Sequence, residues 1–415
     1  MARIATPSEP FLLSSAGSTR ATAYEPSNKS VRIGAKTHVT WLDAVAGVRV
    51  RSFDHRTNTW SDTVTVDEGI DNHTNPCLSR APDGRLRLAY GPHGFWEENI
   101  WNAARFKLLE TEQPDDVSRW RHIRSTGYGA TYASLATDSR GRDHLAYRGG
   151  PDPSDCMYER RIPDTNVVDL VTKVTRVDHH YDYTFCNASL VIGPADVLYL
   201  GFMFYYSSKG PSRGCCALKS TDGGETWTGL DARPTRLPMP YDPEFAVPHR
   251  GDNPYLHALT VDADGHLVAL TGDLGRSAAG SRLCVYRNGR WDCTELDPCL
   301  PDGWVICGGT LSCDARGRLL AAVMAARRDG PLGPGSEAWG SASTECFLMA
   351  SADDGRTFEA TQISRSSPEP NWLPNISRVG PGHDLSRPLV IYTRGVTGAG
   401  CKPGDRTEVY GVWID

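Results

Sequence analysis

The chain has 415 residues, of which 39% are hydrophobic and 23% charged, and it carries a formal net charge of −6. This acidic balance argues against a general nucleic-acid binder, which would show an excess of Lys and Arg. No run reaches the roughly 18 to 20 apolar residues that span a bilayer, so we expect no membrane-spanning helix. The 41 Gly and 28 Pro favour short strands joined by many turns over long helices.

The N-terminus and the cysteines indicate different compartments. Residues 1–17 contain only a three-residue apolar run, which is too short for a signal peptide. The twelve cysteines point the other way, because disulfides belong to oxidising compartments. We therefore expect a secreted or periplasmic protein whose leader is absent from this sequence, with a cytoplasmic protein as the alternative.

A recurrent hairpin organises the chain. A polar turn, often of the form D-x-x-G, stands between two apolar strands at 78–90, 135–147, 190–202, 259–270 and 311–323, and similar hairpins fit at 33–53 and 376–392. The Gly supplies the positive φ of the turn, and the apolar flanks are typical of buried strands. The units recur about every 45 to 65 residues, the length of a four-stranded propeller blade. We predict an all-β fold, a seven-bladed β-propeller formed by a single domain over residues 1–415, with six or eight blades as alternatives.

A second repeated feature supports the propeller. Residues 220–227 and 351–358 both read S-x-D-x-G-x-T-aromatic, a pattern that resembles the Asp-box of sialidase-like propellers. In such a turn the Asp accepts hydrogen bonds from turn amides, the Gly permits the chain reversal, and the aromatic ring packs into the blade. We interpret both segments as structural turns that indicate the fold and not the activity.

Four cysteines and a histidine raise covalent or metal-binding alternatives. Cys284 and Cys293 flank an Asn-Gly turn that would place them on adjacent strands of a hairpin, either as a disulfide or as two reduced thiols. No CxxC motif is present, although Cys307, Cys313 and His257 could form a mixed zinc site if the fold brought them together.

Two consecutive hairpins carry polar side chains at their ends. His73 precedes the hairpin at 78–90 and His93 follows it, while Tyr132 precedes the next hairpin and Arg148 closes it. An antiparallel hairpin returns the chain to the level at which it began. We therefore expect all four side chains on one face of the propeller, although each taken alone would more often be an ordinary loop or structural residue.

The neighbouring segments supply further candidates for substrate binding. His180 and Tyr183 lie just before the hairpin at 190–202, and Tyr206 and Arg213 lie just after it. Aromatic rings at a loop edge suit the CH faces of sugars, and they equally suit plain packing. Asn75, two residues after His73, and His257, in a later blade, complete the candidate set.

A pair of histidines with a tyrosine and an arginine suits β-elimination from a uronic acid. An Arg can bind the carboxylate at C5 and acidify the C5 proton, a His or Tyr can remove that proton, and an acid can protonate the leaving O4. Glycosidases normally need two carboxylic acids, and residues 71–150 offer no such pair.

The segments D-N-H-x-x-P…D-G…G-x-H and T-Y…Y-R-G resemble the opening blades of Asp-box-related propeller polysaccharide lyases. This family includes ulvan lyases and lyases acting on L-rhamnosyl-α-1,4-D-glucuronate. The resemblance implies that His73 and His93 are paired active-site histidines, Tyr132 the catalytic tyrosine and Arg148 the carboxylate-binding arginine, with Tyr183 as a substrate-contacting tyrosine. Departures at HTNP and YRGG, where the family often reads H-N-x-P and Y-R-D-G, leave these four side chains in place.

We therefore expect a polysaccharide lyase that cleaves a 4-linked glucuronate in an acidic polysaccharide or oligosaccharide and needs no organic cofactor, metal ion, nucleic acid or membrane. His93 or Tyr132 would take the C5 proton, and Tyr132 or His73 would assist departure of O4. No motif supports a structural cation in the central channel. The alternatives are a glycoside hydrolase similar to α-L-rhamnosidases on the same propeller, and a non-catalytic propeller that binds sugar.

Overall fold

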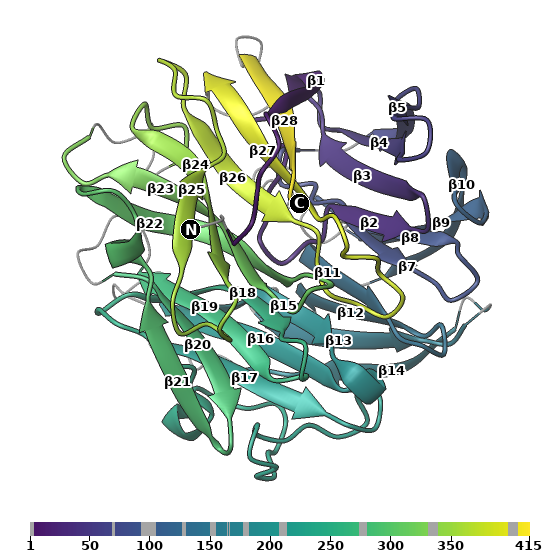
Figure 1. Cartoon of the computed structure of the whole chain (residues 1–415). Coiled ribbons are helices and arrows are strands. Elements are labelled where there is room, and N and C mark those ends of the chain that lie inside the picture. Colours follow the sequence, from purple (N-terminus) through teal and green to yellow (C-terminus); the bar gives the residue numbers. More distant parts are fainter. Residues whose placement is uncertain are drawn as a thin grey trace.

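In the computed structural model the chain is built almost entirely from β-strands (Figure 1). The structure describes residues 4–68, 71–92, 105–126, 130–149, 155–163, 165, 167–176, 182–206, 214–273, 280–330, 339–396 and 406–415, without the side chains at 126, 182, 183, 185–189, 205, 206 and 406. Within these ranges the helices are three single 3-10 turns, η3 (Pro194–Asp196), η4 (Pro243–Phe245) and η5 (Asp297–Cys299). In the described part of the chain, no helix has the length and apolarity that crossing a membrane requires.

The strands of the described residues form seven sheets, which surround a central axis as the blades of a propeller (Figure 1). Blade 1 contains β2 (Ser30–Ile33), β3 (Lys36–Leu42), β4 (Gly47–Asp54), β5 (Thr59–Trp60) and β6 (Val64–Glu68). Blade 2 contains β7 (Cys77–Arg80), β8 (Leu86–Tyr90), β9 (Phe106–Gln113) and β10 (Asp116–Thr126). Blade 3 contains β11 (Thr131–Thr137), β12 (Asp143–Arg148), β13 (Cys156–Arg161) and β14 (Val168–Lys173). Blades 4 and 5 contain β15 (Asp182–Ile192), β16 (Leu198–Tyr206) and β17 (Gly214–Ser220); and β18 (Pro254–Val261), β19 (Leu267–Asp273), β20 (Arg282–Arg287) and β21 (Arg290–Glu295). Blades 6 and 7 contain β22 (Trp304–Cys313), β23 (Leu319–Arg327), β24 (Thr344–Ser351) and β25 (Glu359–Gln362); and β26 (Asn371–Ile376), β27 (Leu389–Val396), β28 (Arg406–Trp413) and β1 (Phe11–Gly17).

The predicted fold class and blade count are confirmed. Each predicted hairpin is a pair of antiparallel strands, β3–β4 in blade 1 and the first two strands of blades 2 to 7. The D-x-x-G turns form as expected: Asp138, Asp262 and Asp314 each accept hydrogen bonds from amides two and four residues on, at 2.8 to 3.1 Å. The glycine of each turn, for example Gly265 with φ 83°, has the left-handed backbone that the turn requires.

Apolar side chains fill the space between neighbouring blades. One buried cluster lies at each of the seven blade-to-blade contacts, and an eighth lies at the axis. Because both faces of a blade are packed, its central strands are continuous apolar runs, such as LLAAVMAAR in β23, and do not alternate with polar residues. The first strands of successive blades contact one another from β7 through β11, β15, β18 and β22 to β26, so they line the axis.

The two ends of the chain close the ring. The N-terminal strand β1 pairs with β28 and becomes the outermost strand of blade 7. Thr6 and Asp415 also exchange backbone hydrogen bonds of 3.0 and 2.9 Å. From β1 at the rim, the chain must cross back to β2 at the axis, and residues 18–29 make that crossing.

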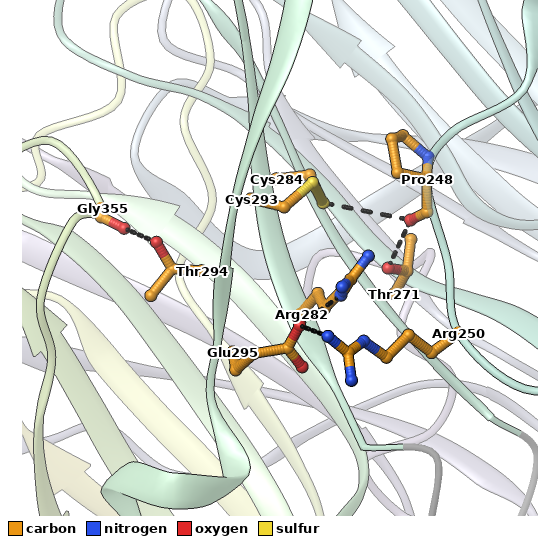
Figure 2. The surroundings of a disulfide bond; sticks show 9 residues. All are labelled: Pro248, Arg250, Thr271, Arg282, Cys284, Cys293, Thr294, Glu295 and Gly355. Atoms are coloured by element: carbon orange, nitrogen blue, oxygen red, sulfur yellow. Dashed lines mark hydrogen bonds and ion pairs between the residues drawn. A yellow bond between two sulfur atoms is a disulfide. The ribbon is translucent and has the colours of Figure 1, made fainter.

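The cysteine pair in blade 5 forms the disulfide that the Asn-Gly turn allowed. Cys284 on β20 and Cys293 on β21 are directly opposite in register and are bonded through their sulfurs (Figure 2). Around the bond, Arg250 and Arg282 both contact the Glu295 carboxylate, at 2.9 and 2.5 Å.

Candidate functional site

The axial strands share a local irregularity that places side chains at the centre of the propeller. The strand register shifts between Thr131 and Ser134 in β11, Phe185 and Ser189 in β15, Leu256 and Ala258 in β18, Ile306 and Gly308 in β22, and Trp372 and Asn375 in β26. A bulge of this kind redirects the side chain of the extra residue. Tyr132 and Leu373 have positive φ there, 58° and 53°, and both join the apolar cluster at the axis.

Residues 18–29, which we call the axial segment, cover this level of the propeller. The segment is buried throughout except for the half-buried Arg20. Its hydrogen bonds reach blades 1, 2, 3 and 7. The bond to Leu42 of β3 measures 3.0 Å and the bond to Asn75, before blade 2, measures 2.7 Å. The bonds to Ala133 of β11 and Leu373 of β26 measure 2.6 and 2.7 Å. The segment therefore connects blades that are distant in sequence.

Tyr132 is at the centre of a compact group of polar aromatic and cationic side chains. The guanidinium carbon of Arg148 lies 4.9 Å from the centre of the Tyr132 ring. The ring of Tyr24 meets that of Tyr132 edge-on at 4.9 Å, and the ring of His73 lies 6.3 Å from it. Tyr132 and Arg148 are 5% and 6% exposed. One guanidinium group, of Arg148, and one imidazole, of His73, thus lie beside the phenol of Tyr132. This arrangement favours proton transfer and anion binding.

His73 is held in a tight turn before blade 2. The Asp71 carboxylate accepts a hydrogen bond of 2.8 Å from the His73 amide and lies 3.9 Å from its Nδ1. The side chain of His73 is 25% exposed, whereas that of Asp71 is 5% exposed. The imidazole is therefore the accessible member of this pair, and the carboxylate fixes the backbone from which it projects.

Three residues of this group were not predicted from the sequence: Arg20, Tyr24 and Trp339. Tyr24 lies nearly parallel to His73, with ring centres 6.2 Å apart, and its hydroxyl accepts a hydrogen bond from Arg20 Nη1. The Arg20 guanidinium carbon lies 5.6 Å from the Tyr24 ring centre and 5.1 Å from that of Trp339. None of the three belongs to a repeated hairpin, so no periodic signal marks them.

Two predicted substrate-binding residues, Asn75 and His257, are buried in the interior of the propeller. Asn75, 1% exposed, accepts hydrogen bonds from the Tyr24 amide at 2.7 Å and from Lys29 Nζ at 2.8 Å. His257, also 1% exposed, packs on Tyr255 with ring centres 4.9 Å apart. Burial lowers the pKa of His257 to about 4 and that of Lys29 to about 7.

The mixed zinc site imagined from Cys307, Cys313 and His257 does not assemble. Cys307 lies in the bulge near the start of β22 and Cys313 at its end, six residues apart along an extended strand. At about 3.3 Å per residue, this spacing separates the two cysteines by about 20 Å. Among the residues that the structure describes, no group of three or more His, Cys, Asp or Glu side chains could hold a metal ion.

The remaining candidate site residues either lie outside the described residues or belong to strands in which their side chains are not described. His93, His180 and Arg213 lie outside the described residues. Tyr183 and Tyr206 belong to β15 and β16, one register position apart in the pairing of these strands, but their side chains are outside the description.

Comparison with known proteins relates the chain to ulvan lyases. No protein-family model matches it. An ulvan lyase of Nonlabens ulvanivorans is 25% identical over 143 residues, 30% of this chain and 30% of that protein. Ulvan Lyase-PL25 of Pseudoalteromonas sp. (strain PLSV) is 24% identical over 142 residues, 30% of this chain and 29% of that protein. The sequence similarity thus spans about three tenths of the curated relatives.

The similarity in structure extends over the whole propeller. A solved PL25 ulvan lyase has a TM-score of 0.72 at 14% identity and covers 97% of this chain and 95% of its own. A structure of a PL25 ulvan lyase with GlcA(1-4)Rha3S bound has a TM-score of 0.71 at 13% identity and covers 96% and 94%. At such low identity the likeness establishes the propeller fold.

Proposed function

We propose that the protein is a polysaccharide lyase that cleaves a 4-linked glucuronate by β-elimination. The observation that carries this proposal is the Arg148 guanidinium 4.9 Å from the centre of the Tyr132 ring, with the His73 imidazole 6.3 Å from the same ring. A cation for the carboxylate, a phenol and an imidazole are the groups that this elimination requires. The sequence similarity to ulvan lyases supports the same reaction class.

Each of these residues has a proposed role in one step of the elimination. Arg148 binds the C5 carboxylate through two parallel N–H donors and offsets its charge, which makes the C5 proton more acidic. Tyr132 or His93 removes that proton, and the electron pair of the C5–H bond forms the C4–C5 double bond. The C4–O4 bond breaks, and Tyr132 or His73 delivers a proton to O4. The products are an unsaturated uronate and a sugar with a free hydroxyl, and no water is consumed.

The proposed substrate is an acidic polysaccharide or oligosaccharide with a rhamnosyl-glucuronate type of linkage. His180, Tyr183, Tyr206 and Arg213 are proposed to contact it from blade 4. We propose a secreted or periplasmic location, which the Cys284–Cys293 disulfide supports because such bonds persist in oxidising compartments.

The test is to incubate the protein with a panel of glucuronate-containing polysaccharides and to record the ultraviolet band of the conjugated product. A lyase produces this band, whereas a hydrolase on the same scaffold releases reducing ends without it. Each polysaccharide is paired with its carboxyl-reduced form, in which the uronate has become a neutral sugar. Elimination from the acidic form alone is the expected result, and cleavage of both forms without the band would overturn the proposal in favour of hydrolysis. Binding without any cleavage across the panel would favour a non-catalytic propeller.

A further inference from the structure

We infer that Arg20 and Tyr24 are positioning residues of this site, and that they set the spacing between His73 and Tyr132. The inference rests on the proposed function, because it concerns how the proton-transferring groups are held. His73 precedes blade 2 and Tyr132 begins blade 3, so the strand pairing within either blade does not fix one relative to the other.

Tyr24 lies against both groups. Its ring centre is 6.2 Å from that of His73 and 4.9 Å from that of Tyr132, and His73 and Tyr132 are 6.3 Å apart. The planes of Tyr24 and His73 differ by 27°, whereas Tyr24 and Tyr132 meet at 83°. Each ring of this triangle therefore packs on the other two, and the Tyr24 ring limits how His73 and Tyr132 can shift.

Tyr24 is itself fixed at both ends. Its amide donates a hydrogen bond of 2.7 Å to Asn75 Oδ1, in the same loop as His73. Its hydroxyl accepts a hydrogen bond from Arg20 Nη1. With only 6% of its surface exposed, Tyr24 has little freedom to choose another rotamer, since buried side chains are closely packed.

Arg20 completes the support. Its guanidinium carbon lies 5.6 Å from the Tyr24 ring centre and 5.1 Å from the Trp339 ring centre, distances at which a cation is attracted to an aromatic face. Trp339 comes from the connection between β23 and β24 of blade 6. The chain of contacts from Trp339 through Arg20 and Tyr24 thus links blade 6 to the groups of blades 2 and 3.

The experiment compares Arg20→Gln, Arg20→Lys and Tyr24→Leu in the full chain, with kcat and KM measured on the polysaccharide that gives the strongest ultraviolet band. Misplacement of a reacting group by about 1 Å can cost ~10²-fold in rate. We expect kcat to fall about 10- to 100-fold in Arg20→Gln and Tyr24→Leu, with KM changed less than about two-fold. Arg20→Lys should recover part of the loss, because the ammonium can still reach the hydroxyl and the rings.

Arg51→Gln is the matched control. The Arg51 guanidinium carbon lies 5.4 Å from the Trp60 ring centre, and Arg51 also donates to a backbone carbonyl, but both residues belong to the outer part of blade 1. This variant should lose a similar contact and keep kcat. All rates are normalised to the folded fraction found by near-ultraviolet circular dichroism.

Three results would overturn the inference: kcat within two-fold of wild type in both Arg20→Gln and Tyr24→Leu, a loss of activity that vanishes after normalisation, or a rise in KM with kcat unchanged. Tyr132→Phe is measured in parallel. Near-normal elimination by that variant would overturn the proposed function itself. Its inactivity together with fully active Arg20→Gln and Tyr24→Leu would overturn only the positioning role.

Discussion

Tyr132 owes its position to the backbone and not only to its side chain. It lies in the β11 bulge with φ 58°, a conformation that is uncommon for residues other than glycine. Such local strain persists only where surrounding contacts enforce it. Here the Arg148 guanidinium and the Tyr24 ring lie on the Tyr132 ring, each at 4.9 Å.

The first prediction concerns the Tyr132 hydroxyl. Tyr132→Phe removes one oxygen and leaves the ring contacts, so the fold and the melting temperature should change little. If the hydroxyl transfers a proton, kcat should fall by ~10²-fold or more. Substrate binding should change much less, because Arg148 still meets the carboxylate; this is measured as the dissociation constant of the inactive variant. A Phe variant with near-wild-type elimination would remove Tyr132 from the mechanism.

The second prediction concerns the guanidinium of Arg148. Arg148→Lys keeps the positive charge but loses the planar pair of donors that matches a carboxylate. We expect a large loss of kcat/KM on glucuronate polymers despite the mild change. Arg387→Lys, in a partly exposed pair with Asp415 at 2.8 Å, serves as a control that should retain activity. Normal turnover by Arg148→Lys would exclude bidentate carboxylate binding.

The sequence predicted some of these positions and missed others for a physical reason. That Tyr132 and Arg148 lie close together could be predicted because both stand at the ends of one hairpin, and antiparallel pairing brings such ends together. Tyr24 and Arg20 were missed because they lie on a connection whose path depends on how the ring closes. His257 was predicted to touch substrate, which stays a prediction; its burial could not be foreseen, because the β18 bulge places it in the interior and a bulge has no sequence pattern as regular as that of a strand.

At the scale of the elements, the two S-x-D-x-G-x-T turns are held by the same set of hydrogen bonds. Asp222 accepts from the amide and hydroxyl of Thr226 at 3.0 and 2.6 Å, and Asp353 accepts from those of Thr357 at 2.9 and 2.7 Å. The ring that follows the first turn, Trp227, is 3% exposed and packs edge-on against Tyr158 at 5.2 Å. The turns therefore anchor the outer edges of two blades.

The third prediction follows from these bonds. Asp222→Ala and Asp353→Ala should each lower the free energy of unfolding by about 1 kcal/mol or somewhat more, because the carboxylate loses its exposed bonds within the turn and a partly buried bond from Ser220 or Ser351. The loss should appear in the melting temperature, while kcat of the folded protein stays near that of wild type. A variant that melts normally and is inactive would show that these turns belong to the catalytic site.

The repeated hairpins made the element order predictable, since each D-x-x-G turn lies between two apolar runs. The disulfide was left as one of two alternatives, because the sequence shows that Cys284 and Cys293 flank a turn but not that they face each other. Register decides this: the two residues are directly opposite across β20 and β21. Similarly, the cysteines of β22 could not be placed together or apart until its length, Trp304–Cys313, was known.

At the scale of the whole molecule, the ring depends on contacts between the ends of the chain. β1 supplies the outer strand of blade 7, and the axial segment then connects that rim to blades 1, 2 and 3. The candidate site is therefore assembled only when the ring is closed, because this crossing brings Tyr24 to Tyr132 and Arg20 to Tyr24. Conditions that weaken the buried contacts of the axial segment should consequently lower both the catalytic activity and the melting temperature.

The last prediction uses pH to probe that interior. Burial lowers the pKa of His257 to about 4 and also lowers the pKa of His249 and His383. Between this value and the ordinary histidine pKa of about 6.5, the unfolded chain binds a proton that the folded chain does not, so acidification favours unfolding. We expect the melting temperature to be constant with respect to these groups above pH ~6.5 and to decline as the pH falls toward ~4.

His257→Phe tests one of these contributions, at a residue where neither ring nitrogen has a hydrogen-bond partner among the described residues. The Phe ring can occupy the same place against Tyr255 without a group that binds a proton. The variant should therefore lose less stability than the wild type between pH 7 and pH 5, in melting curves recorded at constant ionic strength. His122→Gln, at an exposed position of β10, should follow the wild-type curve. If His257→Phe and the wild type decline in parallel, the acid sensitivity lies elsewhere in the propeller, and the buried imidazole at its axis carries no part of it.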